Sequence, residues 1–284
     1  MTLKGNYHTH TTWCDGKAAP EAFIQTAIDA GLEYLGFSAH ACFPFDDDWH
    51  MKVADYRDYF TNILELKDKY KDRIQILTGL EADWIPPATA PDYKIYKGLP
   101  LDYIIGSVHF GGKKGGASPD EWVGIDASTE HVAAGLKNVF GGDGKAFVKD
   151  YYERVRTMAL SSDCDIIGHP DLIRLRNTEL GFFNEDEEWY KDEIRATAEA
   201  FAKSGKVVEI NTGAMSRGLM TTPYPSLDFL KMMKEHGVHI MINSDSHTPE
   251  TLLYGFDEAQ QLARAAGYTE LWYLTREGWQ TQAI

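Results

Sequence analysis

Six short apolar runs in this chain end at residues that can bind a metal ion, and this pattern constrains the possible fold most strongly. Glycine, proline or polar residues typical of turns follow each run. The ligand-type residues at these ends are His8, His10, His40, Glu81, His109, His169, Asp245 and His247. Because His8 and His10 are two residues apart, both imidazoles leave the same face if they lie on a strand.

Segments with helical periodicity alternate with these apolar runs. After a first strand that ends at His10, we expect strands at 34–39, 74–80, 101–108, 165–168, 207–212 and 239–243. The expected helices are 20–30, 55–71, 146–160, 189–202, 226–236 and 249–266, and 270–275 is a further edge strand. Such alternation is typical of parallel α/β folds. Functional residues at nearly every strand end favour a closed barrel over an open sheet, which would gather them at one switch point.

Seven units predict a distorted (β/α)7 barrel with a metal site at the C-terminal ends of its strands. We expect one domain over residues 1–284, because no linker or shift in composition divides the chain. Residues 111–144 break the rhythm and are glycine-rich at both ends. We therefore expect them to form an inserted loop over the site.

Composition narrows the class of protein. The net charge of −15 argues against nucleic acid or an anionic membrane as a partner. No apolar run approaches the length of a membrane span and no leader pattern opens the chain, so we expect a cytoplasmic protein. The three cysteines, Cys14, Cys42 and Cys164, show no disulfide framework. Cys14 and Cys42 lie near expected ligands and are either soft ligands or small filling residues.

The ligand-type residues are too many for one ion. With Asp15, from the polar turn after His10, they number nine and include six of the ten histidines. A single zinc ion takes three or four protein ligands. Two or three divalent ions (zinc, manganese or iron) with a bridging carboxylate account for all nine. The ions would also offset the protein's acidity towards an anionic substrate.

Several of these segments resemble the polymerase-and-histidinol-phosphatase (PHP) superfamily, and especially its histidinol-phosphate phosphatases. The similarity runs from residue 4 to about residue 260, in matching order and spacing. Its motifs are His8-Thr9-His10, Cys14-Asp15-Gly16, Gly79-Leu80-Glu81-Ala82-Asp83, Gly106-Ser107-Val108-His109-Phe110, Gly168-His169-Pro170-Asp171, Glu209-Ile210-Asn211-Thr212 and Ser244-Asp245-Ser246-His247.

The resemblance implies a trinuclear site. One ion would be held by His8, His10, Glu81 and Asp245, and a second by Glu81, His109 and His169. Asp15, His40 and His247 would hold the third. Some members of the superfamily carry histidine where this chain has Asp15; either residue binds a metal ion.

The resemblance also implies an activity, the hydrolysis of L-histidinol phosphate in histidine biosynthesis. Metal ions would activate hydroxide as the nucleophile, with Glu81, Asp245 and His247 as the catalytic residues that hold it. We predict that the small-molecule substrate contacts Arg217, Arg174, Asp83 and His40. The alternative role for Asp83 is to orient a metal ligand. Arginine matches phosphate oxygens bidentately; the alternative for each of the two is a solvated position in a loop. The alternatives are another phosphomonoester, such as a nucleotide or phosphotyrosine, and a non-catalytic scaffold; the oligomeric state stays open.

Two segments have the chemistry to select the rest of such a substrate. Residues 43–50 combine Asp46, Asp47 and Asp48 with aromatic side chains, and the insertion adds Trp122 and Asp126. Carboxylates pair with an ammonium group, and aromatic faces stack on imidazole. A solvated acidic loop with aromatic side chains packed beneath it is the alternative.

Overall fold

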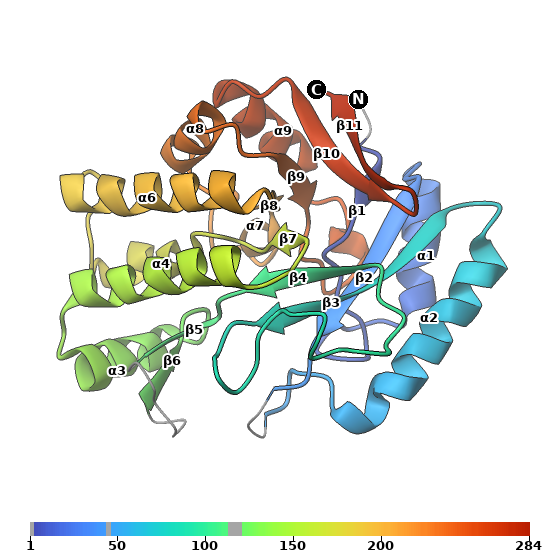
Figure 1. The fold of residues 1–284 in the computed structure, drawn as a ribbon, viewed down its shortest axis with the longest axis horizontal. Coiled ribbons are helices and arrows are strands. Elements are labelled where there is room, and N and C mark those ends of the chain that lie inside the picture. The colour runs from blue at the N-terminus through green and yellow to red at the C-terminus, as the bar shows by residue number, and fades with distance from the viewer. Residues whose placement is uncertain (1–2, 44–46, 113–120) are drawn as a thin grey trace.

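Seven parallel strands form the central sheet of the computed structural model, which describes residues 3–43, 47–112 and 121–284 (Figure 1). The strand order is β1-β2-β3-β4-β7-β8-β9. Their bounds are β1 Gly5–Asn6, β2 Tyr34–His40, β3 Gln75–Asp83, β4 Tyr103–Ser107, β7 Ile166–Ile167, β8 Val207–Asn211 and β9 Ile240–Asn243. Every paired neighbour in this sheet is parallel. The predicted distorted (β/α)7 barrel is therefore confirmed.

The barrel closes at the C-terminal ends of its first and last strands. Thr9 and Ser246 form a single parallel bridge. The amide of His10 donates to the carbonyl of Ser246 over 2.8 Å, and the amide of Ser246 donates to the carbonyl of His8 over 3.2 Å. The expectation that His8 and His10 lie on a strand is wrong, because β1 ends at Asn6. Closure hydrogen bonds, rather than a long strand, hold this segment in place.

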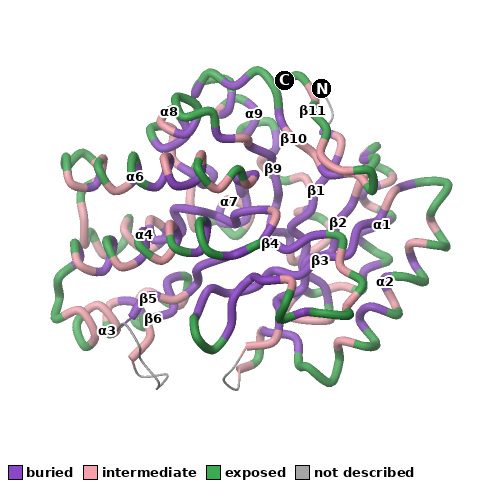
Figure 2. The backbone as a smooth tube through the Cα atoms, viewed as in Figure 1, coloured by how far each residue is buried: buried purple, intermediate pink, exposed green. Residues whose placement is uncertain are grey.

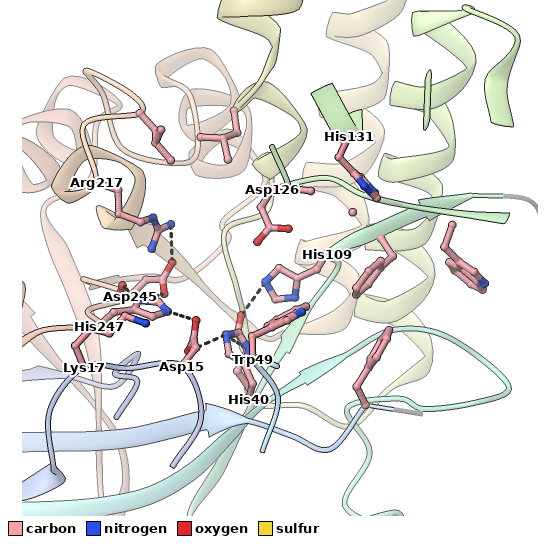
Figure 3. A pocket seen from close by; sticks show the side chains of 18 of the residues that line it. Asp15, Lys17, His40, Trp49, His109, Asp126, His131, Arg217, Asp245 and His247 are labelled. Atoms are coloured by element: carbon pink, nitrogen blue, oxygen red, sulfur yellow. Dashed lines mark hydrogen bonds and ion pairs between the residues drawn. The ribbon is translucent and has the colours of Figure 1, made fainter. Parts of the chain in front are cut away.

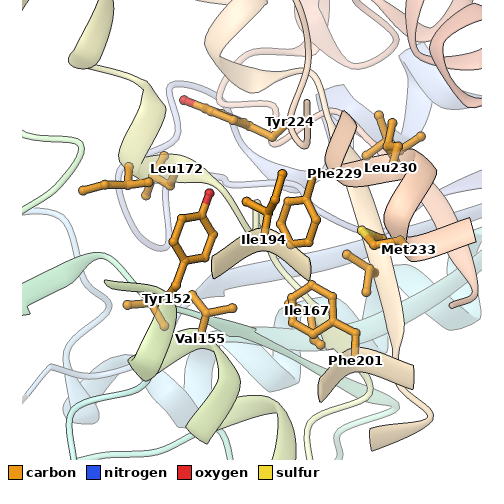
Figure 4. Packing of buried hydrophobic residues seen from close by; sticks show 14 of the residues in the cluster. Tyr152, Val155, Ile167, Leu172, Ile194, Phe201, Tyr224, Phe229, Leu230 and Met233 are labelled. Atoms are coloured by element: carbon orange, nitrogen blue, oxygen red, sulfur yellow. The ribbon is translucent and has the colours of Figure 1, made fainter. Parts of the chain in front are cut away.

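Helices cover the outside of the sheet in two groups (Figures 1 and 2). Helices α1 (Pro20–Asp29) and α2 (Tyr56–Tyr70) lie on one side, and α4 (Gly144–Ser161), α6 (Glu188–Ser204), α8 (Leu227–Glu235) and α9 (Phe256–Ala265) lie on the other. The buried faces of the second group pack in a large cluster that includes Tyr152, Phe201 and Phe229 (Figure 4). The short helical segments are η1 Val53–Asp55, η3 Leu172–Arg174, α5 Asn177–Leu180, α7 Gly213–Ser216 and η4 Pro249–Thr251.

Residues 84–100, for which no element was predicted, lie in turns between β3 and β4. Two other segments differ from the sequence prediction. The helix expected over 249–266 is divided into η4 and α9, because Gly255 has a left-handed φ of 73°. The strand β10 (Glu270–Thr275) lies outside the barrel sheet and pairs antiparallel with β11 (Gly278–Ala283).

The half of the barrel interior nearer the N-terminal ends of the strands, which we call the lower half, is filled by aromatic and aliphatic side chains. Tyr7 and Tyr103 meet edge to face, and the hydroxyl of Tyr103 donates to the carbonyl of Tyr7. A Cβ on Gly36 or Gly79 would lie 2.4 Å from Tyr103, so glycine at both positions makes room for its ring. Leu274 of the β10–β11 hairpin closes this end of the barrel. The titratable ligand-type residues lie at the opposite, C-terminal end of the strands.

The described part of the segment 111–144 contains regular elements where a loop was predicted. Strands β5 (Phe110–Gly112) and β6 (Trp122–Gly124) form an antiparallel pair, and α3 (Thr129–Phe140) follows. Ser128 caps α3 by accepting a hydrogen bond from the amide of His131. Among the described residues, no helix has the length and apolar character needed to cross a bilayer.

Candidate metal centre

The expected ligands converge above the apolar layer of the barrel. Alternate residues of β3 face inward, so Leu77 lies in the lower layer while Glu81 and Asp83 lie in the upper one. The same alternation on β4 places Ile105 below and Ser107 above, and His109 follows two residues after the end of the strand. The upper layer is almost fully buried: His8, His10, His40, Glu81, His109, His169 and Asp245 are each exposed by 7% or less.

Glu81 lies at the centre of this cluster, and its two oxygens face different histidines. Oε1 is 2.9 Å from His169 Nε2 and 3.4 Å from His109 Nε2. Oε2 is 3.0 Å from His8 Nε2 and 3.3 Å from His10 Nε2. Ligand atoms that share an ion with bonds of 2.0–2.1 Å lie about 3.3 Å apart in tetrahedral geometry. The spacing around Glu81 matches that value on both sides.

A second group of side chains gathers around Asp15. Its Oδ2 is 3.1 Å from His247 Nε2, and its Oδ1 is 3.8 Å from His40 Nε2. His40 Nδ1 also lies 3.0 Å from Glu81 Oε2, so the two groups adjoin. Asp245 Oδ1 connects them further, at 3.3 Å from His10 Nε2. Three sets of side chains place one candidate ligand atom each within 4.8 Å of the others: His10, Asp15, His40 and His247; His8, Glu81 and His169; and His8, His10 and Asp245.

Buried atoms without hydrogen-bond partners show that the cluster suits a cation. They include His8 Nε2, His10 Nε2, Asp15 Oδ1, His40 Nδ1 and Glu81 Oε2. Buried polar atoms are nearly always satisfied in folded proteins. Here imidazole nitrogens and carboxylate oxygens face one another, and divalent ions are what this set of donors binds. The residues present therefore fit the metal ions that the sequence predicted.

Carboxylates around the cluster fix the orientation of its imidazoles. Both oxygens of Glu209 lie 3.0 Å from His8 Nδ1, and its Oε1 accepts from the amide of His169. Asp83 Oδ1 is 2.9 Å from His109 Nδ1, so its Nε2 points to Glu81. Ligating histidines commonly bind a carboxylate through the other ring nitrogen. Glu209 belongs to one of the sequence motifs, but no role was predicted for it. Its alternation with Asn211 along β8, which places both side chains on one face, is the pattern that indicates an inward position.

The pKa values of these groups reflect mutual attraction. Burial alone would raise the pKa of Glu81, but His8 and His40 hold it well below its ordinary value. Burial lowers the pKa of His109, and the nearby Asp83 and Glu81 outweigh this effect and raise it to about 10. Burial and His10 together hold the pKa of His40 well below its ordinary value. The cluster thus holds carboxylates in their charged form.

A cavity of about 780 Å³ opens onto the cluster (Figure 3). Asp15, His40, Glu81, His109, Asp245 and His247 line one part of it. Aromatic side chains line another part: Phe43, Trp49, Phe110 and Trp122. Asp126, Lys17 and His131 also line the cavity. Lys17 and His131 were not predicted, and no spacing pattern marks them in the sequence.

The two arginines expected to bind substrate occupy different places. Arg217 lines the cavity, with Nη2 at 3.4 Å from Asp245 Oδ2. Arg174 is not among the lining residues and instead pairs with Asp171 and Glu185. Asp83 is buried between two histidines and does not line the cavity either. This geometry favours an orienting role for Asp83 over contact with a substrate ammonium group.

The described parts of the predicted selecting segments lie beside the cavity. Trp122 and Asp126 line it, and Asp47 hydrogen-bonds the turn that carries Trp49. Asp46 and residues 113–120 lie outside the described residues.

The three cysteines lie in different surroundings. Cys14 Sγ is 3.5 Å from His10 Nδ1, within hydrogen-bond range, while the amide of Cys42 donates to the hydroxyl of Tyr56. Cys164 is buried away from the site.

Fold and site together define an α/β barrel protein with a histidine–carboxylate centre able to hold more than one metal ion. The PHP domain model matches residues 6–213. The chain therefore belongs to the PHP domain family.

Individual relatives and solved structures agree with this assignment. A probable histidinol-phosphatase of Deinococcus radiodurans is 29% identical over 94% of this chain and 95% of its own length. The putative histidinol phosphatase of Listeria monocytogenes has the same fold, with a TM-score of 0.77, 22% identity, and coverage of 90% and 99% of the two chains. The histidinol phosphate phosphatase of Lactococcus lactis, solved with zinc, L-histidinol and phosphate, has a TM-score of 0.67 and 21% identity, with 98% of both chains covered.

Proposed function

We propose that this protein is a metal-dependent phosphatase that hydrolyses L-histidinol phosphate to L-histidinol and phosphate. The observation that carries the proposal is the position of Glu81, whose two oxygens face separate pairs of histidines at the base of a cavity that also contains Arg217. A bridging carboxylate beside an arginine suits a phosphate group held against two or more cations. The relatives named as histidinol-phosphatases support the choice of substrate.

In this proposal, three divalent ions share the centre. His8, His10, Glu81 and Asp245 would hold one ion, and Glu81, His109 and His169 a second. Asp15, His40 and His247 would hold the third. Zinc fits these nitrogen and oxygen donors, and the Lactococcus enzyme was solved with zinc. Manganese and iron are accommodated by the same donors.

The ions, when bound, would activate water for in-line attack on phosphorus and neutralise charge on the phosphoryl oxygens. Residues of the chain would bind the phosphoryl group, orient the metal ligands and exclude water. Arg217 reaches the cavity beside Asp245 and would bind phosphoryl oxygens through its planar fork. Glu209 and Asp83 hold His8 and His109 with their second nitrogens aimed at Glu81. Trp49 and the other aromatic side chains of the wall would exclude water from the far side of the substrate.

The leaving group would occupy the part of the cavity formed by residues 111–144 and the aromatic wall. The side chain of Asp126 faces the same space as Arg217 and His109 (Figure 3). Its carboxylate is the group in this region suited to an ammonium, while the indole of Trp122 or Trp49 suits an imidazole. Residues 1–284 would act as one catalytic unit.

The test is phosphate release by the metal-loaded protein from L-histidinol phosphate, phosphotyrosine, a nucleoside monophosphate and p-nitrophenyl phosphate. We expect the highest kcat/KM for L-histidinol phosphate, and no turnover after removal of the metal with a chelator. A higher kcat/KM for any other substrate would assign the centre to that phosphoester, and the absence of hydrolysis would favour a scaffold.

The variant Asp126→Asn separates recognition from chemistry. It should lower kcat/KM for L-histidinol phosphate at least about tenfold, the cost of one lost charged contact. The same variant should change kcat/KM for p-nitrophenyl phosphate by less than about threefold, because that substrate carries no ammonium. A parallel fall on both substrates would show that Asp126 supports the site without selecting the substrate.

A further inference from the structure

The carboxylate of Asp83 lies between two buried imidazoles, of which only one belongs to the proposed metal centre. Its Oδ1 is 2.9 Å from Nδ1 of His109, and its Oδ2 is 2.9 Å from Nε2 of His50. Asp83 and His50 are 4% and 5% exposed. Each carboxylate oxygen is therefore held by a different ring in a dry environment, where a hydrogen bond constrains its partner most strongly.

His50 comes from the turn after β2, in a segment that we call the Trp49 segment, residues 47–51. Its amide donates to Asp47 Oδ1 over 2.8 Å, and the amide of Met51 donates to the carbonyl of His40 over 3.1 Å. The ring of His50 stacks on Phe43, with centroids 4.5 Å apart and planes inclined by 8°. His50 Nδ1 also lies 3.0 Å from Asp47 Oδ2. Within the part of the chain that the structure describes, the side-chain hydrogen bond of His50 joins its Nε2 to Asp83 Oδ2.

The neighbouring Trp49 covers two proposed metal ligands from the cavity side. Its indole meets the ring of His40 edge to face at 4.6 Å and that of His109 at 5.5 Å (Figure 3). The Trp49 segment therefore contacts the centre at two points. Trp49 packs against the rings of His40 and His109, and His50 hydrogen-bonds Asp83. A shift of this segment would move the cavity wall and release Asp83 together.

We propose that His50 is a positioning residue for the metal centre, acting through Asp83 on His109. With both oxygens held, the Asp83 carboxylate cannot rotate, so His109 Nε2 stays directed at Glu81 Oε1, 3.4 Å away. Loss of the His50 contact frees the carboxylate and lets the His109 ring turn. Removing groups that orient a metal ligand weakens metal binding by about 10–100-fold. His50 contacts Asp83 and not the proposed ligand His109 itself, so we expect a loss of metal affinity at the lower end of that range. This inference rests on the proposed metal site, though not on the identity of the substrate.

Two substitutions at one position test it. The amide nitrogen of His50→Gln occupies roughly the place of Nε2 and keeps a donor for Asp83, whereas that of His50→Asn corresponds to Nδ1 and falls short. Both variants lose the stacking on Phe43. Zinc affinity is measured by competition with a chromophoric chelator, together with the melting temperature of the metal-free protein.

We expect His50→Asn to weaken the binding of at least one zinc equivalent about tenfold and to lower kcat more than it changes KM. His50→Gln should stay within about threefold of the wild type. Equal affinities in the two variants, or losses that follow their melting temperatures alone, would overturn the positioning role.

A third variant, Asp47→Ala, keeps the proposal testable if His50→Asn does not fold. It removes the acceptor that holds the turn, at a partly exposed position, and should weaken zinc binding about threefold. An unchanged zinc affinity in Asp47→Ala would contradict the role of the Trp49 segment in holding His50 against Asp83. Zinc affinity is read without substrate, so a wild type that binds zinc yet hydrolyses no histidinol phosphate defeats only the proposed substrate. If the wild type hydrolyses histidinol phosphate normally but His50→Asn and His50→Gln bind zinc with equal affinity, only the role of His50 is refuted.

Discussion

At the scale of single residues, Arg217 offers a direct test of phosphate binding. Arg217→Lys keeps the charge but loses the planar fork, so transition-state stabilisation should fall. The side chain is 37% exposed, so we expect the lower half of a range of about 1.5–3 kcal/mol, measured as kcat/KM. The matched control is Arg156→Lys, because Arg156 also pairs with a carboxylate, that of Glu193, but on the outer helices. An unaffected Arg217→Lys enzyme would place Arg217 outside the substrate site.

The Asp83–His109 pair should make stability depend on pH in the metal-free protein. His109 and His50 overcome burial and lower the pKa of Asp83, so its contribution is present above about pH 4 and lost in stronger acid. The pKa of His109 is raised to about 10, so its contribution is complete below about pH 6.5 and lost as the pH rises towards 10. Asp83→Asn should therefore cost most between about pH 4 and 6.5, by about 3 kcal/mol.

Chemical denaturation of wild type and Asp83→Asn across this pH range measures the difference in unfolding free energy. With saturating zinc, His109 would be a neutral ligand and the alkaline decline should disappear. A difference that does not vary with pH would mean that the two side chains are not an ion pair.

At this scale the sequence indicated the side chains that gather in the cluster more readily than the groups that orient them. All but one of the proposed ligands follow an apolar run, and the exception, Asp15, lies in the polar turn after His10, so local position indicates them. His50 and Glu209 gain their roles from contacts with Asp83 and His8, which are distant in the sequence. No local pattern reports such contacts. Arg174 shows the opposite failure, since a loop arginine beside a strand end pairs with Asp171 and Glu185 instead.

At the scale of elements, the two ends of the barrel should respond differently to mutation. The β10–β11 hairpin closes the end opposite the site, where Leu274 packs with Tyr7 and Met241. The hydroxyl of Tyr7 also donates to the carbonyl of Leu274 over 2.7 Å. In parallel barrels this end serves stability and the other serves function.

Leu274→Ala should therefore destabilise the protein by about 2–4 kcal/mol through the cavity it leaves. Below the melting temperature, kcat/KM for L-histidinol phosphate should stay within about twofold of the wild type. Denaturant unfolding and steady-state kinetics measure the two effects. A large loss of kcat/KM in a folded Leu274→Ala protein would contradict the separation of the two ends.

The elements themselves were predicted best where periodicity was strong. Helices α2, α4 and α6 and strands β2 and β8 lie close to the expected bounds, because burial imposes their patterns directly. The pairings of β10 with β11 and of β5 with β6 were missed. The sequences of β5, β6 and β11 are short or largely polar, so their apolar alternation is weak.

At the scale of the whole molecule, the net negative charge of the protein accompanies a cluster of carboxylates at the candidate metal centre. The chain carries a net charge of −15, and five carboxylates (Asp15, Glu81, Asp83, Glu209 and Asp245) lie in or around the cluster. Buried charges are costly unless they are compensated. Bound ions would compensate them and, by binding only the folded state, would stabilise the protein. Metal loading should link folding to activity.

Metal content and activity measured together on wild type and Glu81→Gln test the bridging role of Glu81 most directly. Elemental analysis of the zinc-loaded proteins is paired with kcat/KM for L-histidinol phosphate. The wild type should hold two or three equivalents. Glu81→Gln, which keeps the size of the side chain but removes its charge, should lose at least one equivalent and about 100-fold or more in kcat/KM. Full metal content with near-normal turnover in Glu81→Gln would contradict a Glu81-bridged centre.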